Sequence, residues 1–322
     1  MAFPTSTSDA SALLSTPVEG HAPVVRAGGT DLQHRRARDL PPGERDRPLV
    51  DLRDLAGLDA VSSSVDVLSI GARVRVADIA ANAEIVAGWP AFAESAGDLA
   101  TPQIRATATL GGNLLQRVRC WYFRNAAFAC LKKGGSTCFA REGDHIYHSC
   151  FDLGPCVAPA PSTLGLALVA YEGEVELADG ARMTATALYG DGSDARREHM
   201  LPDGALLVAV HLPPAVAGER AAYFRVASRA YAEWPLVDIV ARLVISDGLI
   251  SEAAIVAGGV APVPLRLRAV EEKLIGQAST EAVLDAAAAV AATGANPLPG
   301  TRYKVDLVPP AVREALRRAM GA

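Results

Sequence analysis

The sequence has no cysteine outside residues 120–156, and this absence is the most informative feature of its composition. All five cysteines lie within that segment, at positions 120, 130, 138, 150 and 156 of a 322-residue chain. Five is an odd number, and disulfides are rare in a reducing cytoplasm. Clustered cysteines in an intracellular protein more often bind metal or carry out redox chemistry. We therefore expect one local function for this segment.

Other absences narrow the class of protein. No stretch approaches the roughly 18 uninterrupted apolar residues of a membrane span, so no membrane partner is expected. A secretory signal begins with a basic region that an apolar region follows. The first residues, "MAFPTSTSDASALLSTP", do not have this order, and their sequence therefore predicts a cytoplasmic protein. A net charge of -5 argues against a nucleic-acid binder, which usually presents a basic face. The composition, 50% hydrophobic and 21% charged, is typical of a globular chain with a substantial core.

The pattern of apolar residues predicts an α+β fold of two domains that meet near Gly218. Strands are expected at the start, around 24–26, and again from about residue 221, with "PLVDIVARLVI" a strand or short helix. Helical spacing predicts helices within 74–86, 265–276, 279–294 and 309–320, and Ser279 is the expected cap of the third. Residues 101–119 are polar and rich in Thr and Gly, which favours a loop.

Two glycine turns share one design. "AGGTDL" spans residues 27–32 and "TLGGNL" spans 109–114, and each pairs adjacent glycines with hydroxyl or amide side chains. Adjacent glycines let the backbone approach a ligand closely and turn its N–H groups inward as an anion site. Neither turn matches a known phosphate-binding signature, and a tight hairpin explains an isolated Gly-Gly equally well. Two such turns, one leading directly into the cysteine segment, favour a cofactor.

The cysteine spacing leaves three alternatives. Intervals of 9, 7, 11 and 5 residues contain no short knuckle of the kind that structural zinc sites favour. A four-iron cluster needs four convergent thiolates and tolerates irregular spacing on a loop that wraps it. The remaining alternative is that the thiols are small buried hydrophobes.

At this point the motifs resemble a known family. "RAGGTDL", "IRATATLGGNLLQRVRCWYFR" and "AGGVAPVPLRLRAVEEKLIG" are similar to the FAD-binding (medium) subunit of the molybdenum hydroxylases, the xanthine dehydrogenase family. The resemblance runs from about Pro23 to the C-terminal "RYKVDL". It is strongest to the iron–sulfur-containing flavin subunits of aldehyde oxidoreductases and to the β subunit of 4-hydroxybenzoyl-CoA reductase. Those members carry a 4Fe-4S cluster in an insertion after the second glycine turn.

The resemblance implies a two-subdomain FAD-binding domain of the PCMH/VAO type at 1–217, with the cysteine-rich insertion at about 119–157. A smaller α+β domain of the CO dehydrogenase flavoprotein C-terminal type would follow at 218–322. It also implies the site residues. The FAD-binding ones are Arg26, Ala27, Gly28, Gly29, Thr30, Asp31, Leu32, Thr109, Gly111, Gly112, Asn113, Gln116, Thr163 and Arg225. The cluster ligands are Cys120, Cys130, Cys138 and Cys156, with Cys150 a spare or alternative ligand.

Several residues depart from the family pattern or lack an assigned role. Thr163 stands where relatives have an aspartate that contacts the flavin's sugar chain, and Arg225 stands where a lysine is common. The run "QHRRARD" is basic, which indicates a solvated loop or a patch that faces a partner.

Aromatic and histidine side chains in and near the insertion also need a role. Two roles are expected for Trp121, Tyr122 and Phe123: they shield an iron–sulfur cluster from water, or they fill the hydrophobic core. Three roles are expected for Tyr231 and Trp234: they cover the flavin ring, fill the hydrophobic core or contact another subunit. His145 and His148 are expected to be solvated loop residues rather than metal ligands.

The function implied is electron transfer, with no catalytic residue of its own. The substrate would react at a molybdenum cofactor on a large subunit, and electrons would reach FAD through a small 2Fe-2S subunit and leave to an external acceptor. FAD suits this role because it exchanges electrons singly with iron–sulfur centres and in pairs with acceptors. One alternative is a self-contained FAD-dependent oxidase or dehydrogenase, although the sequence offers no convincing substrate base. Another is a metal-binding scaffold that has lost flavin.

Overall fold

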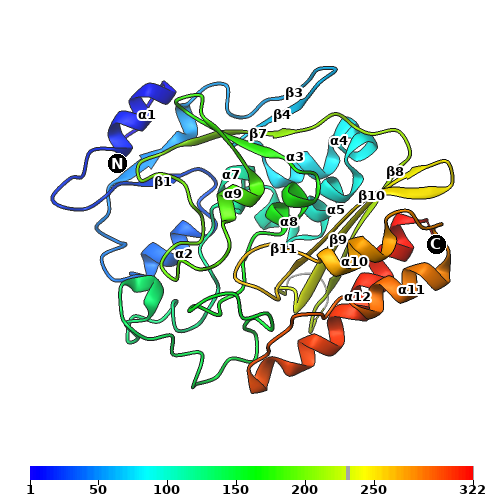
Figure 1. Ribbon diagram of the computed structural model, residues 1–322. Coiled ribbons are helices and arrows are strands. Elements are labelled where there is room, and N and C mark those ends of the chain that lie inside the picture. The colour runs from blue at the N-terminus through cyan, green and yellow to red at the C-terminus, as the bar shows by residue number, and fades with distance from the viewer. Residues whose placement is uncertain (230–232, 322) are drawn as a thin grey trace.

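Three β-sheets follow one another along the chain in the computed structural model, which describes residues 1–229 and 233–321 (Figure 1). The first is a parallel pair of β1 (Val24–Arg26) and β2 (Leu49–Asp51), flanked by α1 (Thr7–Leu14) and α2 (Leu32–Ala37). The predicted strand before the first glycine turn is β1. This small sheet carries that turn at its end.

The second sheet is antiparallel, with strand order β3-β4-β7-β5-β6. Its strands are β3 (Val61–Ser63), β4 (Leu68–Gly71), β5 (Glu174–Leu177), β6 (Arg182–Thr184) and β7 (Leu207–Leu212). Its helices are α3 (Val76–Ala81), α4 (Ala83–Gly88), α5 (Pro90–Asp98), α6 (Pro102–Arg105), α7 (Leu110–Leu114), α8 (Thr163–Ala170) and α9 (Ala185–Tyr189). One continuous apolar core joins this sheet to α5 and α8.

The third sheet has the antiparallel order β11-β10-β9-β8 and is buried on both faces. It comprises β8 (Glu219–Val226), β9 (Val237–Ser246), β10 (Leu249–Gly258) and β11 (Leu265–Arg266). Ile239 and Ile255 point to the layer of α10 (Arg268–Leu274), α11 (Glu281–Ala289) and α12 (Arg302–Ala319). Val240 and Val256 point the other way, into the core of α5 and α8. Because successive strand residues face opposite sides, β9 joins both layers, as Figure 1 shows.

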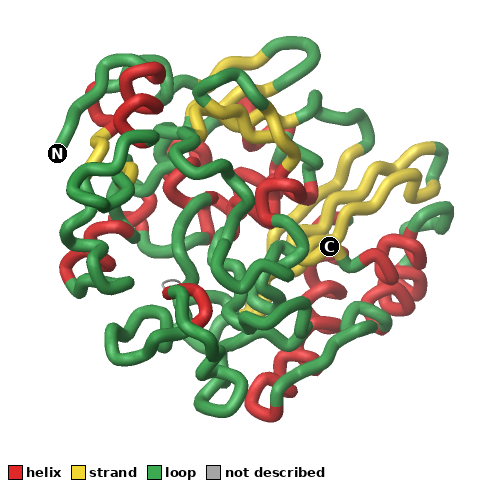
Figure 2. The backbone as a smooth tube through the Cα atoms, turned by 60° about the vertical axis from the view of Figure 1, so that its left-hand side comes forward, coloured by secondary structure: helices red, strands yellow, loops and turns green. Residues whose placement is uncertain are grey.

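The long segment between α7 and α8 is almost entirely loop and includes the cysteines, as the tube in Figure 2 makes plain. It packs against the beginning of α12, through hydrogen bonds between residues that are 157 positions apart in the chain. Tyr303 donates a hydrogen bond to the Ile146 carbonyl, and Lys304, 1% exposed, donates to the carbonyls of Tyr147 and Gly259. A buried amine with these acceptors attaches the loop to the third sheet.

Several local expectations were wrong. The helix predicted within 74–86 is divided at Asn82, whose side chain accepts from two N–H groups at the start of α4. Thr280, rather than Ser279, caps α11. The last helix begins at Arg302 and continues through Pro309 and Pro310. Prolines normally disrupt a helix, but here Val308, Ala311, Val312, Ala315 and Leu316 bury one face of α12 in the core of the third sheet.

No helix in the described parts of the chain combines the length and the apolar character that crossing a bilayer requires.

Substituting Ile239→Ala should lower the free energy of unfolding by about 3 kcal/mol, because Ile239 is fully buried in β9 and the loss of its side chain leaves a cavity. The control is Val65→Ala, where the side chain is 91% exposed and we expect a change within about 0.5 kcal/mol. Urea unfolding measures both. Equal effects would contradict the assignment of β9 to the core.

Candidate cofactor site

The first glycine turn leaves several backbone donors available. In the described structure the N–H groups of Gly28, Gly29 and Thr30 donate to no protein acceptor. Gly29 has φ +74°, and a Cβ on Gly28 would lie only 2.1 Å from the Thr107 carbonyl oxygen. Both positions therefore require glycine. The contact with Thr107 also brings this turn against the chain that enters the second one.

The second glycine turn is a short helix, not the loop expected from its composition. Thr109 caps α7 by accepting from the N–H of Gly112 at 3.3 Å, and the N–H of Gly111 donates to the Ala72 carbonyl at 2.9 Å. These donors are therefore occupied, and the anion site proposed for this turn is not formed by them. The glycines instead let α7 pack tightly, since a Cβ on Gly111 would lie 3.1 Å from that of Ala72.

Asn113 and Gln116 bind the segment that leads into α8. The Asn113 side chain, 8% exposed, accepts from Ser162 Oγ at 2.8 Å and from the N–H of Leu164 at 3.3 Å. Gln116 Nε2 donates to the carbonyls of Asn113 and Pro161, each at 3.1 Å. Both amides thus hold the beginning of α8 against the second turn.

One carboxylate, that of Asp31, joins the first turn to the insertion. Asp31 accepts from Arg35 at 3.1 Å, Arg119 at 2.6 Å and Arg124 at 2.7 Å, and from the backbone N–H of Arg117 at 3.2 Å. Burial would raise the pKa of Asp31, but the neighbouring guanidinium groups, chiefly that of Arg124, lower it below the usual value. Asp31 is therefore anionic at neutral pH.

The other charged residues of the first turn and of α2 are also paired. Arg26 is held by Asp51, a buried carboxylate that Arg53 also contacts. Leu32 is buried at the start of α2, whereas Ala27 is half-buried and Thr30 exposed. The side chain of Arg26 is therefore not available to a phosphate.

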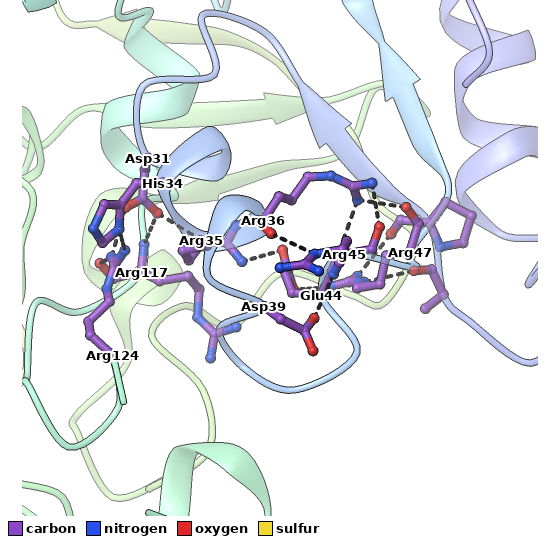
Figure 3. Close-up of polar contacts among 12 residues, drawn as sticks. Asp31, His34, Arg35, Arg36, Asp39, Glu44, Arg45, Arg47, Arg117 and Arg124 are labelled. Carbon is purple, nitrogen blue, oxygen red and sulfur yellow. Dashed lines mark hydrogen bonds and ion pairs between the residues drawn. The ribbon is translucent and has the colours of Figure 1, made fainter. Parts of the chain in front are cut away.

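In the basic segment after the first turn, Arg35 and Arg36 are bonded within the protein (Figure 3), whereas Gln33, His34 and Arg38 are exposed, as expected of a solvated segment. Arg35 is buried and ion-paired with the fully buried Glu44. Arg36 donates to backbone carbonyls of Glu44, Arg45 and Arg47. These arginines therefore shape the loop that follows α2.

Four of the five thiols lie around one small cavity. Its wall includes Cys120, Cys130, Cys138 and Cys156, together with apolar side chains such as those of Val118 and Phe123. Cys150 lies elsewhere, in the core of the third sheet, where its N–H donates to the Val260 carbonyl. Within residues 1–229 and 233–321, no three His, Cys, Asp or Glu side chains are placed to hold a single metal ion.

The thiols differ in acidity. The thiol of Cys156 hydrogen-bonds Cys138, and this bond lowers the pKa of Cys138 to about 6. Burial is the main cause that raises the pKa of Cys120 to about 11. The hydrogen bond from Cys156 therefore favours loss of the Cys138 proton over loss of the other thiol protons.

His148 lies beside these thiols and is not the solvated residue expected. It is 2% exposed, and its Nε2 lies 3.2 Å from Cys120 Sγ, while its Nδ1 is buried without a partner. His145 is likewise bound, between the Ala140 carbonyl and the N–H of Gly300. Tyr122 and Phe123 line the thiol cavity, whereas Trp121 lies outside it.

A second, larger pocket adjoins the first. Cys120 and His148 line both cavities, so they form a shared wall. The other residues that line the larger pocket come from three segments. The insertion contributes Arg119, Trp121 and Tyr147, and the start of α8 contributes Ser162, Thr163 and Leu166. The third sheet and its connections contribute Trp234, Asp238 and Gly259. The Arg119 guanidinium lies 4.6 Å from the Trp234 ring centroid. Tyr231 lies outside the described residues.

Thr163 and Arg225 approach this pocket in different ways. Thr163 is buried, and its hydroxyl lies 3.5 Å from Asp238 Oδ2. Arg225 does not line the pocket, because its guanidinium donates to the carbonyls of Asp98 and Glu233. It therefore supports the pocket through the backbone of Glu233.

Sequence reasoning missed Asp238, Arg119 and His148. Asp238 carried a signal, since it is a charge inside the apolar run "PLVDIVARLVI", whose neighbours are buried on both faces of β9. His148 carried none, because its burial depends on contacts with distant segments.

Comparisons with known proteins agree with this architecture. The family model described as the FAD binding domain in molybdopterin dehydrogenase matches residues 1–215, and that of the CO dehydrogenase flavoprotein C-terminal domain matches residues 222–319. The aldehyde oxidoreductase FAD-binding subunit PaoB of Escherichia coli strain K12 is 32% identical over 278 residues, which are 81% of this chain and 84% of that protein.

Solved structures share the fold. A chain of carbon monoxide dehydrogenase from Hydrogenophaga pseudoflava, in a form that lacks the Mo-pyranopterin moiety, matches with a TM-score of 0.74 at 21% identity. A chain of quinoline 2-oxidoreductase from Pseudomonas putida 86 matches with a TM-score of 0.73 at 20% identity. Each match covers 99% of this chain and 96% of the other.

Asp31→Asn should lower the free energy of unfolding by about 3 kcal/mol at pH 7, because it removes an anion from the buried Arg35 and the largely buried Arg124. The folded-state pKa of Asp31 is lowered, so its stabilising effect is present above the unfolded value of about 3.9 and is lost as pH falls through the folded value. The difference between wild type and variant should thus be constant from about pH 7 to 5 and shrink below about pH 4. Urea unfolding at several pH values measures it, and a difference that grows on acidification would contradict the assignment.

Gly28→Ala should destabilise the protein by about 2 kcal/mol, because the added methyl group meets the Thr107 carbonyl. The matched control is Gly97→Ala in α5, where the nearest atom to a new Cβ lies 3.8 Å away and the helix should gain up to about 1 kcal/mol. Thermal unfolding distinguishes them. A neutral Gly28→Ala would show that the two turns do not require this close approach.

Proposed function

Because this chain belongs to the FAD-binding subunits of the molybdenum hydroxylases, we propose that it is the electron-transfer flavoprotein of a multi-subunit enzyme. Its partners are a large subunit with the molybdenum cofactor and a small 2Fe-2S subunit, and it delivers electrons from the small subunit to an external acceptor. The bound FAD supplies the redox chemistry, exchanging single electrons on one side and pairs on the other. The proposed compartment is the cytoplasm, where the five free thiols would stay reduced.

The first turn fits the pyrophosphate of FAD. Gly28, Gly29 and Thr30 offer unpaired backbone N–H groups on a surface that only glycine allows, and such donors bind phosphate oxygens. The contact of Gly28 with the chain before α7 places the second turn beside this donor group. The residues of the second turn then stabilise the site rather than contact the cofactor, because their polar groups form hydrogen bonds within the protein. These residues are Thr109, Gly111, Gly112, Asn113 and Gln116.

The larger pocket fits the flavin ring. Trp121, Tyr147 and Trp234 give it flat apolar walls, and Thr163, Arg119 and Asp238 supply polar groups at its edge, the composition expected of a cofactor pocket. It is formed where the beginning of α8 meets β9, so the insertion, α8 and the third sheet each contribute a wall.

The four thiols support a 4Fe-4S cluster with Cys120, Cys130, Cys138 and Cys156 as ligands. They surround a common cavity, and a cluster of eight atoms holds its ligands farther apart than a single ion does. The apolar wall excludes water, and the pairing of Cys138 with Cys156 favours loss of the first thiol proton. The observation that carries the proposal is the shared wall, because Cys120 is at once a thiol of the small cavity and part of the flavin pocket.

The test is the visible spectrum and iron content of the anaerobically purified chain, before and after dithionite. We expect flavin bands over a broad iron–sulfur absorbance, both bleached on reduction, and about four iron atoms per chain. Cys156→Ser should lose the iron and its absorbance, whereas the matched variant Cys150→Ser should keep both.

The outcomes separate the parts of the proposal. If Cys150→Ser lost the iron and Cys156→Ser kept it, Cys150 rather than Cys156 would be the fourth ligand. Flavin without iron in the wild-type chain would remove the cluster and leave the flavoprotein role intact. A chain that binds no flavin would overturn the proposal as a whole.

A further inference from the structure

Asp238 is a carboxylate in an unusual place. It is 2% exposed near the start of β9, and among the residues that the structure describes no arginine or lysine forms an ion pair with it. Its Oδ2 is near the hydroxyl groups of Tyr223, at 3.3 Å, and Thr163, at 3.5 Å. Within residues 1–229 and 233–321, its Oδ1 has no hydrogen-bond partner. An unpaired oxygen on a buried carboxylate is costly, so such an atom in a native site indicates a missing donor.

The surrounding structure keeps space for this carboxylate. Gly258 lies opposite Asp238 in the β9–β10 register, and a Cβ there would lie 2.4 Å from Oδ1. Only glycine at 258 therefore leaves the oxygen in place. The side of Asp238 that is not enclosed by Thr163, Tyr223 and Gly258 forms part of the larger pocket.

The charges around Asp238 define what it can bind. Burial raises the pKa of Asp238 to about 6, opposed by the Tyr223 hydroxyl and by the more distant Arg225 and Lys304. Among the described residues Oδ1 has no donor, and an acceptor oxygen in the wall repels the oxygens of a phosphate. The ligand atom beside it must be a neutral N–H or O–H donor, and the aromatic walls nearby suit a planar ring.

We propose that Asp238 is a flavin-positioning residue whose Oδ1 accepts a hydrogen bond from an N–H or O–H group on the ring-bearing half of FAD. The inference rests on the proposed function, since it assigns the larger pocket to the flavin ring. It gives β9 a direct role in holding the cofactor. Among the described residues Oδ2 has protein donors and Oδ1 has none, so the cofactor can supply the missing donor to Oδ1.

The experiment compares FAD with ADP as ligands of the full-length chain from which flavin has been removed. ADP has the pyrophosphate but no flavin ring. Asp238→Asn should weaken FAD binding about tenfold or more, because a hydrogen bond to a charged acceptor is lost, and should leave ADP binding unchanged. The flavin-free variant should melt at the same temperature as wild type or higher, since a buried charge has been removed.

The matched control is Glu219→Gln. Glu219 is also a largely buried carboxylate with one unpartnered oxygen, but it pairs with Arg242 and lies outside the pocket. This variant should bind FAD as wild type does. If Asp238→Asn does not fold, Asp238→Ala replaces it, with the same expected contrast between FAD and ADP.

Two results would overturn the inference alone: wild-type affinity of Asp238→Asn for FAD, or an equal loss of FAD and ADP binding together with a lower melting temperature. The second would mean that Asp238 is only structural. A wild-type chain that binds neither ligand would overturn the proposed function, and the inference with it.

Discussion

The site depends on one carboxylate, Asp31, more than on any glycine or cysteine. A single buried anion accepts hydrogen bonds from three guanidinium groups and one backbone N–H, and these donors come from α2 and from the beginning of the insertion. Arg119 then extends the connection to Trp234 of the third sheet. Burying one charge among several opposite charges is stabilising only when all partners are present. The first turn, the insertion and the third sheet are therefore energetically coupled through this group.

This coupling explains why the insertion can be almost entirely loop and yet enclose two cavities. A segment with little secondary structure needs tertiary contacts to be ordered. Asp31 holds its beginning, and the start of α12 holds its middle through Lys304, Tyr303 and Gly300. Between these attachments the aromatic side chains of Tyr122, Phe128 and Phe139 pack against one another. The thiols thus occupy positions set by both ends of the protein.

The sequence was sufficient for the α+β class and for the family, and the family models and PaoB confirm both. It was also sufficient for β1, because Val24 and Val25 are β-branched. It was insufficient where distant contacts decide the outcome. Pro309 and Pro310 suggested a helix start, but burial of α12 overrides them. The separation of Cys150 from the other thiols follows from its packing against Val260, which no local pattern contains. The environment of Asp238 likewise requires Thr163 and Tyr223, which lie far apart in the chain.

Lys304 has a consequence for the timing of assembly. Its amine donates to the carbonyl groups of Tyr147 and Gly259, which lie 157 and 45 residues earlier in the chain. Contacts between such distant segments form late in folding, because the closure entropy of the long intervening loops must first be overcome. The cavities can therefore reach their final shape only after α12 has packed against the insertion and the third sheet, so this helix determines when the cofactor site is complete.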